Sequence, residues 1–293
     1  LEIKKGEMIG FVGTNGSGKT TTIRNMLGYI RPTSGKCVVL GKESWTHGAD
    51  IAKHIGYVPG EIGFPDLPTG TAFLKSQAEF FGLNANELIQ KLQLDPNANL
   101  KRMSKGMKQK TALVAALMND ADIIVLDEPT TGLDPLMRVA FMDIIMEQHK
   151  KGKTIFMSSH MFNEVEESCD RVALIDQGHI INVVSMDEIR NRPVKEYKIE
   201  FKNEIDYLQF KTFGFEIIRD QKQYHQVTVR IQNAQINELM GSLSTLQVKF
   251  ISEEKYTLER HFREVCLVKL CLNNHVKPMA LCGVLLHLLY VLC

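Results

Sequence analysis

The sequence has no long apolar run, no excess of charge and no regular cysteine spacing, and each absence excludes a class of protein. No window approaches the ~18 consecutive apolar residues of a membrane-spanning helix, which excludes a polytopic membrane protein. Lys and Arg number 35 and Asp and Glu 34, so bulk charge gives no reason to bind nucleic acid or an anionic membrane. With 44% hydrophobic residues the chain can offset the entropy of ordering, which excludes intrinsic disorder.

The six cysteines do not form a disulfide framework. Cys37 and Cys169 stand alone, and the other four crowd the last segment of the chain. Since no signal peptide precedes them, a reducing cytosolic setting is the simplest interpretation. The chain opens at Leu1 with a segment that already has the pattern of a strand and turn, which indicates an N-terminal truncation.

The first two-thirds of the chain alternates short apolar strands with helical patterns, and this alternation predicts an α/β fold with a mostly parallel sheet. The expected strands are Met8–Val12, Ile123–Leu126 and Thr154–Met157, and the expected helices are Lys19–Tyr29 and Pro135–Lys150. Asp134 before Pro135 is a typical helix start. In the helix that follows, Val139, Met142, Met146 and His149 mark one stripe.

Helical patterns dominate residues 64–118, which we interpret as an all-helical insertion into an α/β domain that spans residues 1–192. A hairpin around Asp176-Gln177-Gly178 is expected to close that domain. After the linker Arg192-Pro193, residues 195–264 have a βαββαβ-like order that predicts a small separate α+β domain. The tail, 265–293, resembles neither part and is interpreted as a frameshifted, truncated or divergent end.

The strongest motif matches G-x-x-x-x-G-K-[ST] in full, directly after a predicted strand and at the start of a predicted helix. Its glycines let backbone N–H groups approach phosphate oxygens, and the helix N-terminus adds partial positive charge. Lys19 is expected to reach the β- and γ-phosphates and the Thr20 hydroxyl to bind Mg²⁺. The residues predicted to bind nucleotide are Gly13, Thr14, Asn15, Gly16, Ser17, Gly18, Lys19, Thr20 and Thr21.

A second motif ends the apolar strand at Ile123–Leu126 with two adjacent carboxylates, Asp127 and Glu128. Asp127 is the expected Mg²⁺ partner, through water, as in P-loop NTPases. Glu128 is then placed beside the γ-phosphate, where it would orient or deprotonate the attacking water, a role typically worth ~10²–10⁴ in rate.

A third motif, Met103-Ser104-Lys105-Gly106-Met107-Lys108-Gln109, begins a helical run with Ser104 at the capping position. Here the sequence resembles the ATP-binding cassette (ABC) family, whose signature is L-S-G-G-Q, although Met103 and Lys105 depart from that pattern. Pro129–Asp134 follows Glu128 and looks like the family's D-loop, and Ser158-Ser159-His160 looks like its switch histidine. Together these motifs cover about two-thirds of the chain.

The resemblance implies a mechanism in which two cassettes pair head to tail around two ATP molecules. It implies that Lys19, Thr20, Asp127, Glu128 and His160 act from one cassette, with Lys19, Glu128 and His160 catalytic. Ser104 and Gly106 would complete the ATP site of the partner cassette, and Asp134 would cross the interface. The implied cofactors are ATP and Mg²⁺.

One departure from the family concerns the end of the strand before the helical insertion. The family usually has a glutamine there that contacts Mg²⁺ and the attacking water, whereas this chain has Gly60, followed by Glu61. Either Glu61 or water could take that place, and slower catalysis or looser coupling is the consequence we expect. The aromatic residue that stacks on adenine in the family is expected upstream of Leu1.

The function predicted by the resemblance is the ATP-hydrolysing subunit of a transporter, peripheral on the cytoplasmic face of the membrane. It would dock on separate membrane subunits through its helical insertion, and no nucleic-acid partner is expected. The segment Phe64–Thr69 and the appended domain resemble bacitracin- and lantibiotic-type exporters, which favours export. The alternatives are a soluble non-transport ABC ATPase of DNA repair or translation and a degenerate cassette that binds ATP as a regulator.

Overall fold

The computed structural model describes residues 1–81 and 85–273. Contacts divide these residues into two compact units. The large unit comprises Leu1–Met186 together with the residues described from Val265 onward, and the accessory domain comprises Asp187–Glu264. The boundary between the units therefore lies a few residues before the linker that the sequence predicts at Arg192-Pro193.

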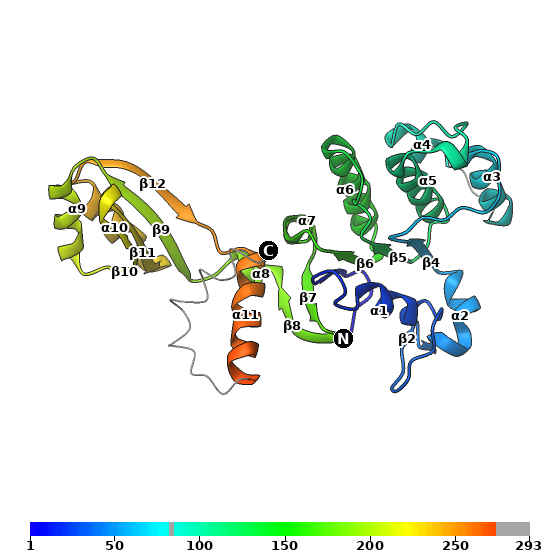
Figure 1. Cartoon of the computed structure of the whole chain (residues 1–293), viewed down its shortest axis with the longest axis horizontal. Coiled ribbons are helices and arrows are strands. Elements are labelled where there is room, and N and C mark those ends of the chain that lie inside the picture. The colour runs from blue at the N-terminus through cyan, green and yellow to red at the C-terminus, as the bar shows by residue number, and fades with distance from the viewer. Residues whose placement is uncertain (82–84, 274–293) are drawn as a thin grey trace. The chain divides into compact units, whose positions relative to one another are not determined.

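The large unit is built on a six-stranded sheet with the strand order β4-β5-β6-β1-β7-β8 (Figure 1). Five strands run parallel and β8 pairs with β7 in the antiparallel sense. The strands are β1 (Met8–Val12), β4 (Ile55–Val58), β5 (Ile123–Asp127), β6 (Thr154–Ser159), β7 (Arg171–Asp176) and β8 (His179–Ser185). The predicted fold class, a mostly parallel α/β sheet, is thus confirmed.

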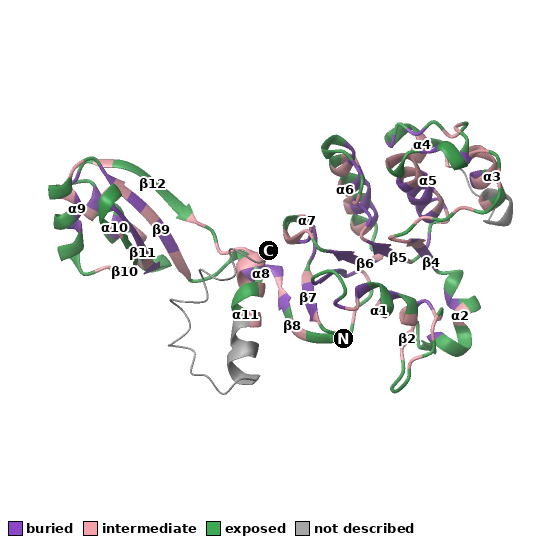
Figure 2. Ribbon diagram, in the orientation of Figure 1, coloured by how far each residue is buried: buried purple, intermediate pink, exposed green. Residues whose placement is uncertain are grey.

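The central strands are apolar because helices cover both faces of the sheet, and they form the buried interior of the large unit (Figure 2). On one face Phe11 packs with Ile23 and Ile51 of the helices. On the other face Gly10 leaves room for Val165, since a Cβ at Gly10 would lie 2.0 Å from its Cγ1. The helices here are α1 (Lys19–Met26), α2 (Ser44–Ala52), α6 (Pro135–Lys150) and α7 (Phe162–Ser168), and a small hairpin is formed by β2 (Val38–Val39) and β3 (Lys42–Glu43).

Helix α6 begins and ends where the sequence predicts, but its buried face is different. Val139 is 61% exposed, whereas the helix buries Met137, Phe141, Ile144, Ile145 and Gln148. The stripe that contains Val139 is therefore not the buried face, because apolar residues occupy more than one side of this helix, between the charged residues Arg138, Asp143 and Glu147. Only the position of the neighbouring elements selects between these sides.

The segment between β4 and β5 is helical, with no long strand among its described residues. Within it α5 packs most of its length against the rest of the large unit, with Leu113 and Val114 fully or almost fully buried. Thr69 and Asn99 pair across the start of the segment. Its elements are α3 (Gly70–Phe81), α4 (Asn86–Lys91), the 3₁₀ turn η1 (Leu100–Arg102) and α5 (Lys105–Leu117).

The hairpin that joins β7 to β8 turns at Gln177 and Gly178, as the sequence predicts. Both residues have positive φ, 48° and 78°, which is the requirement of a type I′ turn. Gly178 N–H donates a hydrogen bond of 2.8 Å to the carbonyl of Ser17. The hairpin turn therefore supports the loop that precedes α1.

The accessory domain has the order βαββαβ and an antiparallel sheet with the strand order β10-β11-β9-β12, the arrangement of a split βαβ fold. The helices cover one face of the sheet, where Tyr207 and Phe210 pack with Leu239 and with alternate residues of the strands. The elements are β9 (Val194–Phe201), α9 (Glu204–Phe210), η2 (Lys211–Phe213), β10 (Glu216–Gln221), η3 (Lys222–Tyr224), β11 (Gln226–Gln232), η4 (Asn233–Gln235), α10 (Ile236–Leu243) and β12 (Val248–Glu254).

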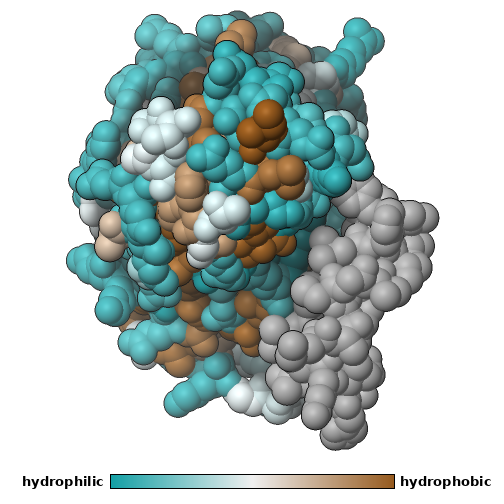
Figure 3. All heavy atoms as spheres, turned by 90° about the vertical axis from the view of Figure 1, so that its left-hand side faces the viewer, coloured by the Kyte–Doolittle hydropathy of each residue, from teal (hydrophilic) through white to brown (hydrophobic). Residues whose placement is uncertain are grey.

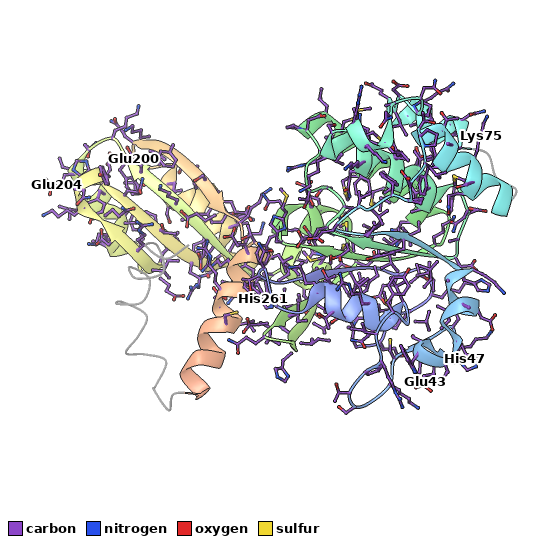
Figure 4. All side chains as sticks on the ribbon, turned by 45° about the vertical axis from the view of Figure 1, so that its right-hand side comes forward. Glu43, His47, Lys75, Glu200, Glu204 and His261 are labelled. Atoms are coloured by element: carbon purple, nitrogen blue, oxygen red, sulfur yellow. The ribbon has the colours of Figure 1, made fainter. Side chains whose placement is uncertain are left out.

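The surface of the accessory domain mixes charged side chains with a few apolar ones. Ile205, Leu208 and Met240 are exposed on its helices, and Figure 3 shows apolar side chains among hydrophilic ones on this side of the molecule. Glu200 on β9 and Glu204 at the start of α9 are labelled in Figure 4.

Two further helices, α8 (Met186–Arg190) and α11 (Leu258–Asn273), extend across the two boundaries of the accessory domain in the chain. Of the predicted atypical tail, residues 274–293 lie outside the described residues. In the described ranges, no helix is both long and apolar enough to cross a membrane.

Candidate nucleotide site

The loop between β1 and α1 has a backbone that only glycine permits at three places. A Cβ at Gly13 would lie 2.3 Å from the carbonyl oxygen of Ile175, and Gly16 and Gly18 have φ of 79° and 107°. Ser17 N–H donates to the carbonyl of Thr14 at 3.1 Å, which closes the loop. The predicted phosphate-loop residues therefore form one tight turn at the carboxyl end of the central strand.

The N-terminus of α1 presents free donors at this loop. Gly18 occupies the capping position without a side-chain cap, and the first intrahelical bond comes from Thr22 N–H. The amides of the first turn, which includes Thr20 and Thr21, therefore have no partner within the helix. Because Thr14, Asn15, Gly16, Thr20 and Thr21 are exposed, an anion can approach from solvent.

The Lys19 side chain is 5% exposed and lies over its own loop. Its Nζ donates hydrogen bonds to the carbonyls of Gly13 (2.8 Å) and Thr14 (3.1 Å). It also lies 3.3 Å from Oε1 of Glu128. The ammonium is thus held between the phosphate loop and the carboxylate at the end of β5.

Glu128 is the point at which three of the predicted catalytic side chains meet. Its Oε1 pairs with Lys19, and its Oε2 lies 3.1 Å from Nδ1 of His160, which follows β6. Glu128 has a φ of 47°, a left-handed conformation that is uncommon outside glycine. The carboxylate is 23% exposed, so a water molecule can reach it.

Asp127 precedes Glu128 at the end of the buried strand and is 1% exposed. Its Oδ1 accepts a hydrogen bond of 2.6 Å from the Ser158 hydroxyl, whereas its Oδ2 is buried without a hydrogen-bond partner in the described structure. Gly60 lies beside this carboxylate, since a Cβ there would be 3.5 Å from Oδ2. Burial raises the pKa of the nearby Tyr57 to about 12, and the negative charge of Asp127 adds to this shift.

The predicted Mg²⁺ ligands fit a magnesium ion in their chemistry. Mg²⁺ prefers oxygen ligands, usually one or two protein groups with several waters. The buried, unpartnered Oδ2 of Asp127 is such an oxygen, and the Ser17 hydroxyl of the phosphate loop is a second buried oxygen without a partner in the described chain. Thr20 supplies an exposed hydroxyl on the first turn of α1.

The predicted signature lies at the N-terminus of α5. Ser104 caps this helix, with its Oγ accepting from Met107 N–H at 3.2 Å, and it is exposed. Gly106 passes close to the D-loop, since a Cβ there would lie 3.2 Å from the carbonyl oxygen of Gly132. The buried Gln109 donates from Nε2 to the carbonyl of Pro129 at 2.7 Å. The signature helix and the D-loop of one chain are thus connected.

Asp134 is exposed and caps α6, its Oδ1 accepting from Met137 N–H at 3.0 Å. Earlier in the same loop, the buried Thr130 donates its hydroxyl proton to Oε2 of Glu164 on α7 at 2.8 Å. The D-loop is therefore anchored near both ends, and Gly132 and Asp134 are exposed.

The fold thus brings Lys19, Glu128 and His160 together and places Asp127 next to Glu128. Ser104, Gly106 and Asp134 have no contact with these residues in the described structure of one chain. The sequence analysis assigned no role to Ser158, Gln109 or the Thr130–Glu164 pair. A polar residue that directly follows the apolar part of a buried strand, as Ser158 follows Met157, is the signal that could have indicated it.

A phosphate loop after the central strand, a second strand that ends in two carboxylates, and a helical insertion between them define a P-loop nucleotide hydrolase. The family model described as ABC transporter matches residues 1–131. The chain is 30% identical to the bacitracin transport ATP-binding protein BcrA of Bacillus licheniformis, over 89% of each chain. It is 34% identical to the ABC transporter ATP-binding protein NatA of Bacillus subtilis, over 71% of this chain and 86% of NatA.

Other matches cover less of this chain. An uncharacterised ABC transporter ATP-binding protein of Nostoc sp. is 38% identical over 64% of this chain, and the chain spans 59% of that relative. A solved ATP-binding subunit of an ABC transporter superposes with a TM-score of 0.60 at 28% identity, over 65% of this chain and 83% of that one. A dimeric ABC cassette, MJ0796, has a TM-score of 0.59 at 23% identity, over 64% and 88%, and supports the fold alone.

The chain belongs to the ATP-binding subunits of ABC transporters, and it is an ATPase of that family.

Proposed function

We propose that this chain hydrolyses ATP with Glu128 as the group that orients and deprotonates the attacking water. The observation that carries this proposal is the Glu128 carboxylate held between Lys19 and His160, at 3.3 Å and 3.1 Å. Lys19 then stabilises negative charge on the β- and γ-phosphates, and His160 holds the carboxylate from the opposite side. The first-turn amides of α1 bind the phosphates themselves.

Thr20 and Asp127 are the residues that would hold Mg²⁺, with Asp127 acting through water. When bound, Mg²⁺ neutralises charge that develops on the phosphate oxygens. The unpartnered Oδ2 of Asp127 supports this assignment, since a buried carboxylate oxygen without a partner is costly unless a ligand completes it.

We infer that two cassettes assemble around ATP, with Ser104 and Gly106 of one closing the site of the other. Two observations support this. Ser104 is exposed at the N-terminus of α5, and in the described chain it makes no hydrogen bond to Lys19 or Glu128. The exposed Asp134 then lies on the surface that would meet the partner cassette.

Export through separate membrane subunits is the transport direction that the relatives favour. BcrA is named for bacitracin transport, and a Mycobacterium tuberculosis relative, 29% identical over 85% of this chain, is named for fluoroquinolone export. A cavity of about 220 Å³ is lined by the segment after β4 and by α3 and α5, with Tyr57, Phe64 and Phe73 among its walls. We propose this cavity as the place where a membrane subunit docks, which would hold the chain on the cytoplasmic membrane face.

The central test replaces Glu128 by Gln and measures ATP turnover by the purified chain. Loss of the base predicts a decrease of ~10²–10⁴ in rate. Nucleotide affinity should stay within a few-fold of the parent. Glu167→Gln is the matched control, because Glu167 is an exposed carboxylate on α7. Unchanged turnover in Glu128→Gln would support a degenerate regulatory cassette, for which Gly60 and the altered signature give the specific grounds.

A second test separates a transporter subunit from a soluble ABC ATPase. The tagged full chain is recovered from detergent-solubilised cells of its host. A transporter subunit is expected to bring down a protein with several ~20-residue apolar spans. Tight, salt-dependent recovery of ribosomes or DNA in its place would contradict the transport proposal.

A further inference from the structure

Ser158 lies beside the Asp127 carboxylate and the Glu128 backbone of the nucleotide site, and it is completely buried. It is paired in register with Asp127 on the neighbouring β5 and with Phe11 on β1. Its hydroxyl lies 2.6 Å from Oδ1 of Asp127 and 3.1 Å from the backbone nitrogen of Glu128. One side chain therefore contacts both functional residues at the end of β5.

The direction of these hydrogen bonds is fixed by chemistry. A serine hydroxyl has one proton to donate and can accept from other groups. Because the Glu128 N–H donates to Ser158, the hydroxyl proton is free to go to Asp127. The Glu128 N–H also lies 3.1 Å from the carbonyl oxygen of Ser158, so the amide is held by two oxygens of one residue.

The hydrogen bond to Oδ1 determines which oxygen of Asp127 remains available. It is the one side-chain hydrogen bond that Asp127 makes within residues 1–81 and 85–273, and it leaves Oδ2 without a partner. On the side of Oδ2 lies Gly60, which has no side chain to orient the carboxylate. Rotation of the carboxylate about its Cβ–Cγ bond is therefore opposed by Ser158.

The same residue acts on Glu128 through the backbone. Glu128 adopts a φ of 47°, which non-glycine residues keep only where surrounding contacts impose it. The two contacts from its N–H to Ser158 are such restraints. They hold the backbone from which the Glu128 carboxylate reaches Lys19 and His160.

We propose that Ser158 is a positioning residue of the ATPase site, which orients Asp127 so that Oδ2 faces the metal and holds Glu128 in its left-handed conformation. The proposal rests on the assignment of Asp127 as the Mg²⁺ partner. Ser158 itself touches neither nucleotide nor metal. Its contribution is to keep Oδ2 of Asp127 available for the metal. Residue 60 cannot do this, because it is a glycine and has no side chain.

The test compares Ser158→Ala with the parent protein by the Mg²⁺ dependence of nucleotide binding. Affinity for a fluorescent ATP analogue is measured over a series of Mg²⁺ concentrations and in EDTA. Loss of a residue that orients a metal ligand typically costs 10–100-fold in metal affinity or activity, so the Mg²⁺ concentration for half-maximal enhancement should rise by about tenfold or more. Affinity in EDTA should change by less than about twofold, because phosphate contacts do not involve Ser158.

Three further variants keep the result interpretable. Ser158→Thr retains the hydroxyl and should restore the Mg²⁺ dependence, whereas Ser158→Cys keeps the size but weakens the donor and should give an intermediate shift. Ser168→Ala removes a hydroxyl of similar burial on α7, which donates to the carbonyl of Glu164, and should leave the Mg²⁺ dependence unchanged.

A Mg²⁺ dependence in Ser158→Ala and Ser158→Cys equal to that of the parent would overturn the proposal. So would an equal loss of affinity with and without Mg²⁺, since that is the result of general damage to the site. Because binding and not turnover is measured, the test is separate from that of the proposed function. A parent protein that binds Mg²⁺ and ATP but does not hydrolyse ATP would contradict the proposed function and leave the role of Ser158 intact.

Discussion

The two units of this chain differ in how completely their buried polar side chains are hydrogen-bonded. In the described part of the large unit several buried polar atoms have no hydrogen-bond partner, among them Oδ2 of Asp127 and the Ser17 hydroxyl at the nucleotide site. In the accessory domain Glu196 accepts four hydrogen bonds, two from Arg230 and two from Arg260. Within the described residues, the buried side-chain polar atoms without a partner all lie in the large unit.

This difference indicates that the polar groups of the large unit serve ligand binding, whereas those of the accessory domain serve stability. A buried group without a partner costs free energy in the folded chain and keeps an open position for a ligand. A fully paired carboxylate such as Glu196 has no such position left. We therefore expect substitutions of polar residues to alter ATP chemistry in the large unit and local stability in the accessory domain.

Among the variants that test this comparison, the largest effect is expected from Lys19→Ala. Removing the ammonium removes charge-assisted bonds to phosphate, each worth roughly 1.5–3 kcal/mol, so ATP affinity should fall by about 10–100-fold or more. Equilibrium binding of a fluorescent ATP analogue measures this. Lys36→Ala, an exposed lysine after α1, is the control. If Lys19→Ala kept the ATP affinity of the parent, the ligand-binding role that we assign to the polar groups of the large unit would be contradicted.

Glu196→Ala tests the other side of the comparison. It leaves Arg230 and Arg260 without their shared carboxylate and should destabilise the accessory domain by roughly 1–3 kcal/mol. Hydrogen exchange in the full chain should show faster exchange in β9 and β11, while ATP turnover stays the same. Glu238→Ala, on the exposed side of α10, is the control. A loss of turnover in Glu196→Ala without faster exchange would contradict the separation.

Acidic pH is expected to lower the stability of the accessory domain. Burial opposes the charged form of Glu196, but hydrogen bonds from Arg260 and Arg230 outweigh it and hold its pKa below the ordinary value. Hydrogen bonds from Lys211 and Tyr207 likewise lower the pKa of Asp220.

A carboxyl group with a lowered pKa in the folded state contributes stability that is complete above its unfolded pKa and is lost as the pH falls through the folded value. Protection of β9 should therefore decrease as the pH falls below about 4, the ordinary range of carboxyl groups. Glu196→Gln should make the protection of β9 less dependent on pH. If the pH dependence stayed the same, titration of other groups would be its cause.

Asp134→Ala should have the smallest effect on stability. Loss of a helix N-cap typically costs ~1 kcal/mol, because Met137 N–H loses its acceptor. Asp134→Ser keeps a capping oxygen and should restore stability. If Asp134 also crosses a cassette interface, the serine variant should recover the melting temperature but not ATP turnover. Full recovery of both would limit Asp134 to its role as a cap.

Features formed by residues that are close together in the sequence could be predicted from the sequence. The phosphate loop depends on glycines and a lysine within eight positions, and its conformation follows from them. The Gln177-Gly178 turn, the start of α6 at Asp134 and the βαββαβ order are also local, because turn and cap chemistry depend on near neighbours. The resemblance to ABC cassettes supplied the roles of residues that these local rules could not assign.

The failures and omissions involve distant partners. The buried face of α6 could not be predicted, because apolar residues on more than one side of the helix leave its orientation to the elements it packs against. Ser158 and Asp127 are 31 positions apart, and Arg260 and Glu196 are 64 positions apart. No periodicity connects such pairs.

The sequence by itself determined that this chain has a phosphate-loop motif, two carboxylates at the end of a buried strand and a serine-capped helix start at Ser104. These follow from residue types at short spacing. The tertiary structure alone decided that Lys19 and His160 share the Glu128 carboxylate, and that Ser158 takes one oxygen of Asp127 and leaves the other free. The reason is that parallel strands from distant parts of the chain end side by side, so only their register brings these side chains within hydrogen-bonding distance.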